Sequence, residues 1–337
     1  MRAVVVDELT GPRAAIIRDV PEPVGAHRRA DGRRVLVDVH AVGLSFIDPL
    51  QTRGLYQAGV PAPYVCGSEI SGRVLEAPED SWVKPGDRVS GIVWQGAMAD
   101  RALALDDFMV RIPDSMSYVD GAAVYMNYAT AWYALDRAGA GDGETVLISG
   151  AAGGVGTCLI DLGPAFGVDT IALVSSEDKA TLAADLGATH VVRTDGTGGP
   201  WLEQVRALTG GRGVEVFVDQ VGADLFLDLM RSLRIGGRGV VVGFAGGSIP
   251  EVKVNRLLLR NLTLTGITMD VMETEHPGTL RRVREGVQEL LDSGRITPRV
   301  GATFPMERAA DALASLEERT SVGKVVVQVK PERPMSG

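Results

Sequence analysis

The stretch from Thr145 to Gly156 constrains the fold of this chain more than any other. It consists of a short apolar strand, a turn rich in glycine and alanine, and the beginning of a helix. Glycines let a backbone approach phosphate groups closely, and a helix N-terminus offers free N–H groups and a partial positive charge. An ordinary tight turn would share this pattern, but alternating strands and helices continue behind it as far as residue 267. The sequence therefore predicts a dinucleotide pyrophosphate site at this turn.

Apolar runs and turn residues alternate regularly from position 145 onward. The runs predict strands at 145–149, 170–174, 190–193, 214–218, 238–243 and 262–267. Helices are expected between them, beginning near Gly154, Glu177, Trp201, Asp224 and Val254. Strands joined by helical crossovers form a doubly wound parallel sheet, so we predict an α/β fold for this region.

The two ends of the chain have a different pattern. Short alternating strands are predicted at 2–6, 14–18, 33–39, 70–75 and 87–92, a spacing typical of an irregular barrel. A helical pattern then covers 118–138, and a strand is expected at 323–329 near the C-terminus. We therefore expect the tail to rejoin the β-rich region. One domain would consist of residues 1–120 and 296–337, and the other of residues 121–295.

Composition narrows the classes of function. The chain has 337 residues, 45% of them hydrophobic and 23% charged, which suffices for about two cores. A net charge of −9 argues against binding to nucleic acid or to an anionic membrane. No apolar run reaches transmembrane length, and Asp7 and Glu8 interrupt the first run too early for a signal peptide. Two cysteines and four scattered histidines predict no metal site. We expect a cytoplasmic protein with a small-molecule partner.

Five motifs resemble those of a known superfamily: residues 41–48 (AVGLSFID), 67–69 (GSE), 84–89 (KPGDRV), 151–156 (AAGGVG) and 323–326 (GKVV). In this order and spacing they resemble the medium-chain dehydrogenase/reductase superfamily and, within it, the NADPH:quinone oxidoreductase branch. The resemblance covers essentially the whole chain. It implies a GroES-like catalytic domain, a Rossmann domain that binds NADP(H), and an active-site cleft between them. It also implies a homodimer or a homotetramer.

Departures from the superfamily's zinc enzymes are informative. Zinc alcohol dehydrogenases carry a cysteine and a Gly-His-Glu motif at the catalytic metal, and the matching positions here are Ser45 and Ser68. Hydroxyls are poor ligands for Zn²⁺ beside thiolate and imidazole, and the cysteine cluster of the structural zinc is also missing from the sequence. Without zinc no strong Lewis acid polarises an alcohol. We therefore expect hydride transfer to an acceptor that is already electrophilic, such as a quinone or an activated C=C bond.

The residues after the second strand of the Rossmann unit bear on the choice of cofactor. NAD enzymes tend to place a carboxylate there for the ribose 2′-OH, whereas this chain has Ser175 and Ser176, with Lys179 one turn later. Hydroxyls and an ammonium suit a 2′-phosphate and predict NADP(H). Alternatively, Ser176 only caps the next helix and Lys179 is solvated. Arg193, near the end of the third strand, is a further candidate for the phosphate.

The resemblance assigns roles to further residues. Cofactor contacts are implied for Thr130, Gly153, Gly154, Val155, Gly243 and Phe244. Substrate contacts are implied for Ser45, Asp48, Tyr56, Asn127 and Tyr128. Two of these residues have an alternative, purely structural role. Thr130 would also suit a helix core, and Tyr56 would also suit the rim of a pocket that it only shapes. Many quinone reductases have asparagine at the position of Ser45. No Ser-His-Asp or Cys-His arrangement supports hydrolysis, and no general acid is evident.

These observations predict a zinc-independent, NADPH-dependent oxidoreductase that reduces quinone-like acceptors. An enoyl or enone reductase, acting on an α,β-unsaturated carbonyl or acyl-CoA, would share every motif, although only Arg53 near the substrate segment offers a charge for CoA phosphates. A non-catalytic NADPH-binding sensor or scaffold is the alternative from another class. The strand at 262–267 is expected at a sheet edge, where it would pair across a two-fold axis.

Overall fold

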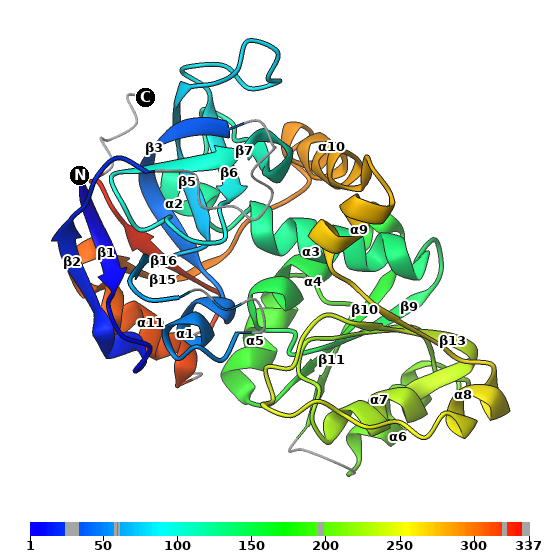
Figure 1. Ribbon diagram of the computed structural model, residues 1–337. Coiled ribbons are helices and arrows are strands. Elements are labelled where there is room, and N and C mark those ends of the chain that lie inside the picture. The colour runs from blue at the N-terminus through cyan, green and yellow to red at the C-terminus, as the bar shows by residue number, and fades with distance from the viewer. Residues whose placement is uncertain (24–33, 57–58, 60, 195–198, 319–321, 332–337) are drawn as a thin grey trace. The chain divides into compact units, whose positions relative to one another are not determined.

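The computed structural model describes residues 1–23, 34–56, 59, 61–194, 199–318 and 322–331. They form two compact units (Figure 1). The first unit comprises Met1–Met126, Leu280–Gly294 and Pro298–Gly337, and the second comprises Asn127–Thr279 and Arg295–Thr297. The domain limits predicted from the sequence remain a prediction.

Among the described residues, a six-stranded parallel sheet forms the centre of the second unit. In spatial order its strands are β11 (His190–Arg193), β10 (Asp169–Val174), β9 (Thr145–Ser149), β12 (Val214–Asp219), β13 (Leu233–Val241) and β14 (Thr263–Gly266). The chain order reverses at the neighbouring strands β9 and β12. In open α/β sheets such a reversal marks the place where ligands bind, beyond the carboxyl ends of the strands. The predicted doubly wound sheet is confirmed.

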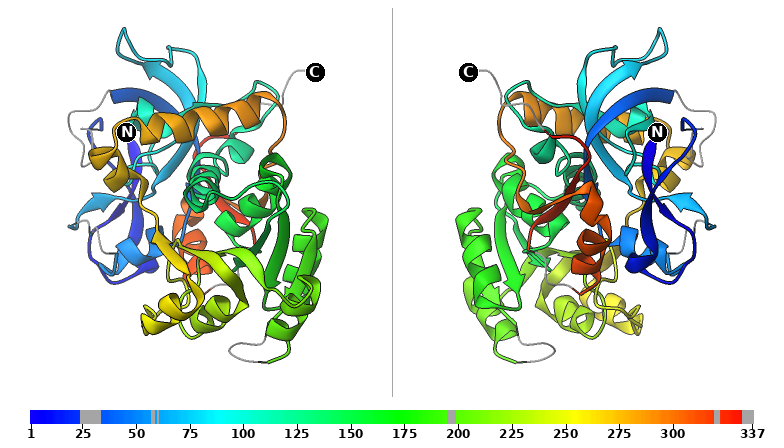
Figure 2. Two further views of the ribbon diagram at one scale, coloured as in Figure 1. Left: turned by 90° about the vertical axis from the view of Figure 1, so that its right-hand side faces the viewer. Right: turned by 90° about the vertical axis from the view of Figure 1, so that its left-hand side faces the viewer.

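Helices lie on both faces of this sheet (Figures 1 and 2). They are α4 (Gly154–Phe166), α5 (Glu177–Asp185), α6 (Trp201–Leu208), α7 (Leu225–Ser232) and α8 (Asn255–Arg260), with α3 (Tyr125–Ala138) and α9 (Met269–Glu275) completing the unit. Side chains alternate between the two faces of a strand. Leu147 and Phe217 therefore point to the same face, where they join Trp201 and Leu229 in one buried apolar cluster. No helix in the described part of the chain is both long and apolar enough to cross a membrane.

The first unit is built on two sheets, counting the residues that the structure describes. The smaller one has the order β2 (Ala15–Asp19), β1 (Arg2–Val6), β4 (Tyr64–Val65). The larger one has the order β15 (Val300–Pro305), β16 (Lys324–Gln328), β3 (Arg34–Leu44), β5 (Glu69–Glu76), β6 (Arg88–Ile92), β8 (Met109–Arg111), with β7 (Arg101–Leu105) paired to β3. β16 pairs antiparallel with β3, so the C-terminal segment completes the sheet that the N-terminal segment begins.

Short helices connect and cover these sheets. They are α1 (Ile47–Thr52), α2 (Tyr118–Gly121), α10 (Thr279–Asp292), α11 (Ala309–Glu317) and the 3₁₀ turns η1 (Pro12–Ala14), η2 (Asp106–Phe108) and η3 (Met306–Arg308). α10 is fixed to β8 because the Gln288 side chain accepts from the Arg111 N–H at 2.8 Å and donates to its carbonyl at 3.0 Å. Its Arg284 guanidinium lies 4.6 Å from the centre of the Trp82 ring.

Several elements differ from the sequence prediction. The helix predicted over 118–138 is two helices, α2 and α3. α2 packs so closely that a side chain at Gly121 would start 2.4 Å from Ser71 Oγ. The strand predicted at 33–39 continues to Leu44, and the strand predicted at 238–243 begins earlier, at Leu233. The short strands β7 and β8 have no counterpart in the prediction, since neither has a long alternating run.

Candidate active site

The glycine turn after β9 forms the first part of the site. Gly150 has φ +61°, a left-handed conformation that glycine adopts without strain. A side chain at Gly156 would start 2.5 Å from the Gly150 carbonyl, so the helix packs tightly onto its own turn. Gly153 is different, because it is exposed and an added Cβ would meet only the Gly150 carbonyl, at 3.2 Å. The turn therefore exposes Gly153 to solvent beside the first N–H groups of α4, which have no acceptor within the helix.

A buried carboxylate ties this turn to the neighbouring strand. Asp219, the last residue of β12, is fully buried and accepts from the Ser149 hydroxyl and from the N–H groups of Val221, at 2.9 Å, and Gly222, at 3.0 Å. Burial raises the pKa of Asp219, and these hydrogen bonds oppose the shift. The Gln220 side chain also donates to the Ser149 carbonyl, at 3.0 Å. The sequence analysis did not identify Ser149 and Asp219 as a pair, although each of them ends an apolar strand.

The segment after β13 joins the same edge of the sheet. Gly243 donates its N–H to the Asp219 carbonyl at 3.4 Å, and Gly246 donates to the Val221 carbonyl at 2.7 Å. Phe244 lies over Gly222, where an added Cβ would start 2.8 Å from its ring. The structure thus brings Gly243 and Phe244 to the carboxyl edge where the glycine turn lies.

The residues after β10 form a small polar group. Ser176 caps α5 by accepting from the Lys179 N–H at 3.4 Å, which is the structural role proposed as the alternative. The Lys179 ammonium nevertheless turns back to Ser175 Oγ, at 3.3 Å, instead of extending into solvent alone. Arg193, at the end of β11, is paired with Glu177 at 2.9 Å, and both side chains are exposed. Two cations therefore lie beside the strand ends, one of them already partnered by a carboxylate.

Helix α3 places its three candidate residues differently. Asn127 is 4% exposed and lies against the glycine turn, since a Cβ at Gly154 would start 2.6 Å from Asn127 Nδ2. Tyr128 is 1% exposed and donates its hydroxyl to Asp161 of α4 at 2.6 Å. That carboxylate also accepts from the Thr297 N–H at 2.7 Å. Thr130 is half-buried. This geometry favours a structural role for Tyr128, and it places Asn127 against the glycine turn.

A second polar cluster lies in the first unit, where β16, β3 and β5 are neighbours. Lys324 begins β16, Glu69 begins β5, and Ser45 directly follows β3. The Lys324 ammonium lies 2.5 Å from Glu69 Oε2 and donates to Ser45 Oγ at 3.0 Å. The Met126 N–H donates to the other carboxylate oxygen of Glu69, at 2.8 Å. Burial raises the pKa of Glu69, and the neighbouring ammonium opposes this shift. Lys324 and Glu69 were missed as site residues, because they are distant in sequence from Ser45.

Asp48 fixes the backbone of Ser45 through a hydrogen bond. Its Oδ2 atom accepts from the Ser45 N–H at 2.7 Å and from the Ser68 hydroxyl at 3.1 Å. Asp48 is 1% exposed, and burial raises its pKa to about 6 in spite of these hydrogen bonds. Ser45 and Asp48 are therefore brought together. Tyr56 is half-buried after α1, and residues 57, 58 and 60 beside it lie outside the described residues.

The donor set of this cluster is hydroxyl, carboxylate and ammonium. An ammonium is not a metal ligand, and hydroxyls compete poorly with thiolate and imidazole for zinc. Within the ranges that the structure describes, no three His, Cys, Asp or Glu side chains are grouped so that they could hold a metal ion.

Comparison with known proteins supplies the family. The model of the alcohol dehydrogenase GroES-like domain matches residues 31–130, and the model of the zinc-binding dehydrogenases matches residues 154–285. Quinone oxidoreductase-like protein 2 of Rattus norvegicus is 38% identical over 332 residues, which cover 98% of this chain and 92% of the relative. The chain belongs to the quinone oxidoreductase branch of the medium-chain dehydrogenase/reductase superfamily. It is thus an oxidoreductase of that superfamily, with the GroES-like and Rossmann folds that the resemblance implied.

Solved structures of the same superfamily agree over nearly the full length. Mycobacterial Rv1454c in complex with NADPH is 31% identical with a TM-score of 0.86, and the match covers 98% of this chain and 100% of that one. The quinone oxidoreductase of Thermus thermophilus, also solved in complex with NADPH, is 30% identical with a TM-score of 0.80 and the same two coverages.

Proposed function

We propose that this medium-chain oxidoreductase uses NADPH to reduce quinone-like acceptors without zinc. The observation that carries the proposal is the cluster around Ser45, where the hydroxyls of Ser45 and Ser68 stand at the positions that match zinc ligands of related dehydrogenases and the Lys324 ammonium donates to Ser45. Such a cluster offers hydrogen bonds from hydroxyls and from an ammonium that is paired with Glu69, but no strong Lewis acid. A quinone needs no Lewis acid, because it already accepts hydride and needs only to be positioned.

The carboxyl edge of the second unit fits NADP(H). The open side of Gly153 and the free N–H groups of α4 suit a pyrophosphate, and Val155 lies in the first turn of that helix. Lys179 and Ser175 would hold the 2′-phosphate, and Arg193 would assist after exchanging its bond to Glu177. The two similar structures named above were solved with NADPH. When bound, the nicotinamide supplies a hydride.

The remaining residues of this chain would bind and orient. Asn127 lies against the glycine turn and would orient the cofactor, with Gly243 and Phe244 beside it at the same edge and Thr130 as a further contact. Ser45, held by Asp48, would face the acceptor, and Tyr56 would donate its phenol to an acceptor oxygen. We leave Tyr128 out of the proposed contacts, because its hydroxyl is bound to Asp161.

The test is NADPH oxidation in the presence of EDTA. 1,4-Benzoquinone, an ortho-quinone, a 2-enal and crotonyl-CoA would serve as acceptors, and the series would be repeated with NADH. We expect turnover of the quinones, faster with NADPH. Preference for the enal or the CoA ester would replace the proposal with double-bond reduction. Binding of NADPH with no turnover on any acceptor would favour a sensor or scaffold.

We further propose a homodimer. In the described part of the sheet β14 is an edge strand, paired only with β13. Close to it in sequence, α8 and the residue before it expose three apolar side chains, Val254 (75%), Leu258 (77%) and Leu259 (76%). Light scattering after size exclusion would report the mass, and a monomer at micromolar concentration would contradict the proposal. The cytoplasmic location remains a prediction.

A further inference from the structure

Lys324 carries a charge that is almost completely buried. Its side chain is 3% exposed and that of Glu69 is 0% exposed. Burying an ion pair is expensive, and replacing such a pair by apolar residues of similar size is often neutral or stabilising. Stability alone is therefore a weak reason for this arrangement. The ammonium also has a second partner, Ser45, which is only half-buried and lies at the accessible side of the cluster.

The fold makes room for this ion pair. Gly43 of β3 is in register with Glu69 of β5 on one side and with Val326 of β16 on the other. A side chain at Gly43 would start 1.9 Å from the Ala122 carbonyl oxygen and 2.7 Å from both Glu69 Oε2 and Lys324 Cε. The pair therefore occupies the space above a strand position that has no side chain. Three neighbouring strands fix its atoms, so the ammonium is held in place before any ligand arrives.

The hydroxyl of Ser45 is held in place by the bond that it accepts, but its own proton is donated only to a weak acceptor. It accepts from Lys324 at 3.0 Å, and its own proton points to the thioether of Met126, 3.0 Å away. A thioether is a poor acceptor of hydrogen bonds. Any incoming oxygen, and above all one that gains negative charge, would be a better acceptor for this proton. Because the hydroxyl already accepts from a cation, the bond that it donates is strengthened.

We propose that Ser45 donates a hydrogen bond to the acceptor oxygen that becomes negative during reduction, and that Lys324 is the positioning residue that polarises and orients this hydroxyl. This inference rests on the proposed function. The acceptor receives a hydride, which carries two electrons, and its oxygen is left as an anion. One proton from solvent then completes the reduced product. No covalent bond forms to Ser45 or Lys324. The hydrogen bond from Ser45, polarised by Lys324, stabilises the anion before it is protonated.

The kinetic test uses variants that separate the hydroxyl from the ion pair. Ser45→Ala removes the donor, and Ser45→Thr keeps it. Lys324→Met alone would leave a buried carboxylate without its cation, so the informative variant is Lys324→Met with Glu69→Gln, which removes both charges. Lys330→Met is the matched control, because Lys330 follows the same strand but pairs with Asp38.

We expect Ser45→Ala and the double variant each to lower kcat for 1,4-benzoquinone by about 10- to 100-fold. The dissociation constant of NADPH, measured by fluorescence without an acceptor, should stay within about two-fold. Ser45→Thr should retain most of the activity, and Lys330→Met all of it. Unchanged kcat in both Ser45→Ala and the double variant would overturn the inference. Absence of turnover in the wild type would instead refute the proposed function.

A second measurement needs no turnover. The phenolate form of 4-nitrophenol resembles the monoanion of a hydroquinone. This phenolate has its own absorption band, so its formation can be followed directly. With saturating NADP⁺ present, the fixed ammonium should lower the pKa of the bound phenol by about one unit in the wild type. The double variant keeps the Ser45 hydroxyl but not the ammonium that polarises it, so its shift should be clearly smaller. Equal pKa values in the two proteins, or no phenolate band with the wild type at saturating probe, would contradict the role of Lys324.

Discussion

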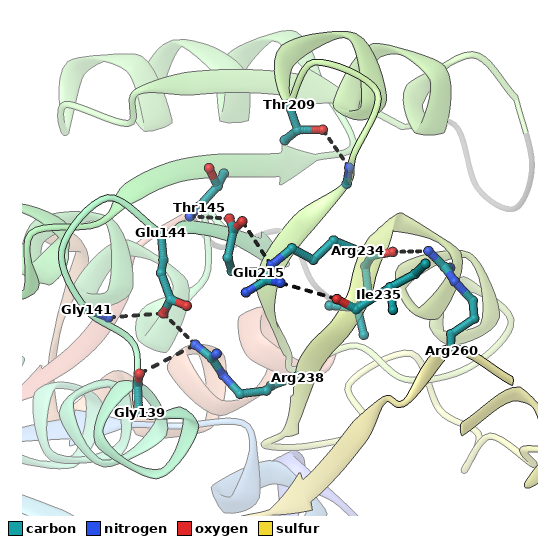
Figure 3. A network of polar contacts seen from close by, with 12 residues as sticks. Gly139, Gly141, Glu144, Thr145, Thr209, Glu215, Arg234, Ile235, Arg238 and Arg260 are labelled. Atoms are coloured by element: carbon teal, nitrogen blue, oxygen red, sulfur yellow. Dashed lines mark hydrogen bonds and ion pairs between the residues drawn. The ribbon is translucent and has the colours of Figure 1, made fainter. Parts of the chain in front are cut away.

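The two edges of the parallel sheet in the second unit are built in opposite ways. At the amino edge, charged side chains are paired with one another and with the backbone (Figure 3). Glu144 pairs with Arg238 and accepts from the Gly141 N–H, while Glu215 pairs with Arg234 at 3.1 Å and accepts from the Thr145 N–H at 2.9 Å. These bonds tie β9, β12 and β13 together where the strands begin.

The carboxyl edge of the same sheet is rich in glycines, and it carries charged side chains near the ends of β10 and β11, of which Glu177 and Arg193 are exposed and Lys179 is half-buried. Asp219, a fully buried carboxylate at this edge, is satisfied by a serine and by backbone N–H groups. The N–H groups at the start of α4 lie beside the exposed Gly153 and have no acceptor within the helix. An edge whose charged side chains pair with one another stabilises the fold, whereas an edge with N–H groups that lack acceptors within the helix can bind a ligand. Substitutions at the two edges should therefore separate stability from cofactor binding.

The largest effect is expected from Gly153→Asp. Gly153 is the N-cap of α4 with φ −82° and ψ 176°, a conformation open to any residue. Aspartate is a good N-cap and should stabilise the helix by about 0.5–1 kcal/mol. The same carboxylate would repel a pyrophosphate, so the affinity for NADPH should fall about 100-fold. Calorimetric titration and thermal unfolding would measure the two effects. Gly153→Asn, a neutral cap, is the control and should lose much less affinity.

A smaller effect is expected from Asp219→Asn. Asparagine would direct an N–H₂ group at the Gly222 N–H, which should destabilise the fold by about 2 kcal/mol. The pKa of Asp219 is raised in the folded protein, so the folded state binds a proton at a pH where the unfolded state does not. Lowering the pH through the folded pKa toward the ordinary value should therefore stabilise the wild type relative to the variant.

Urea denaturation of both proteins from neutral pH down to the ordinary aspartate pKa of 3.8 would measure this dependence. A difference in unfolding free energy that stays constant over this range, or that moves the other way, would contradict the burial of Asp219 as the main cause of its shift.

At the amino edge, Arg238→Met should affect stability alone. It leaves the half-buried Glu144 without its cation, and we expect a loss of about 1–2 kcal/mol. The dissociation constant of NADPH should not change, because the substitution lies at the opposite end of the strands. Adding Glu144→Gln should restore part of the stability. A weaker affinity for NADPH would show that the two edges are not independent.

The smallest effect concerns the choice between cofactors. Lys179→Met should raise the KM for NADPH about 10-fold and leave that for NADH unchanged, because only NADPH has the 2′-phosphate. Arg193→Ala should also raise the KM for NADPH more than that for NADH. Steady-state kinetics with both cofactors would measure this, and thermal unfolding should show no change for Lys179→Met. Equal effects on the two cofactors would remove these cations from the proposed phosphate site.

The sequence predicted the second unit far better than the polar clusters. Strands such as β9, β10 and β12 are compact apolar runs followed by a turn, and such local patterns locate the elements directly. The cluster of Ser45, Glu69 and Lys324 depends on which strands become neighbours and in which register, and neither is encoded locally. Tyr128 shows the limit of resemblance, since a family position near the active site does not reveal that its hydroxyl reaches Asp161.

The sheet of the first unit has a consequence for how the protein is made. Ser45 and Lys324, which share a hydrogen bond, are 279 positions apart, and β16 pairs with β3. A ribosome therefore releases β3 long before its partner strand exists, while Thr145–Gly266, which supplies every strand of the parallel sheet described here, emerges without interruption. Because domains generally fold as units during synthesis, the parallel sheet should form first on the nascent chain. The serine–lysine pair would be assembled only as translation ends.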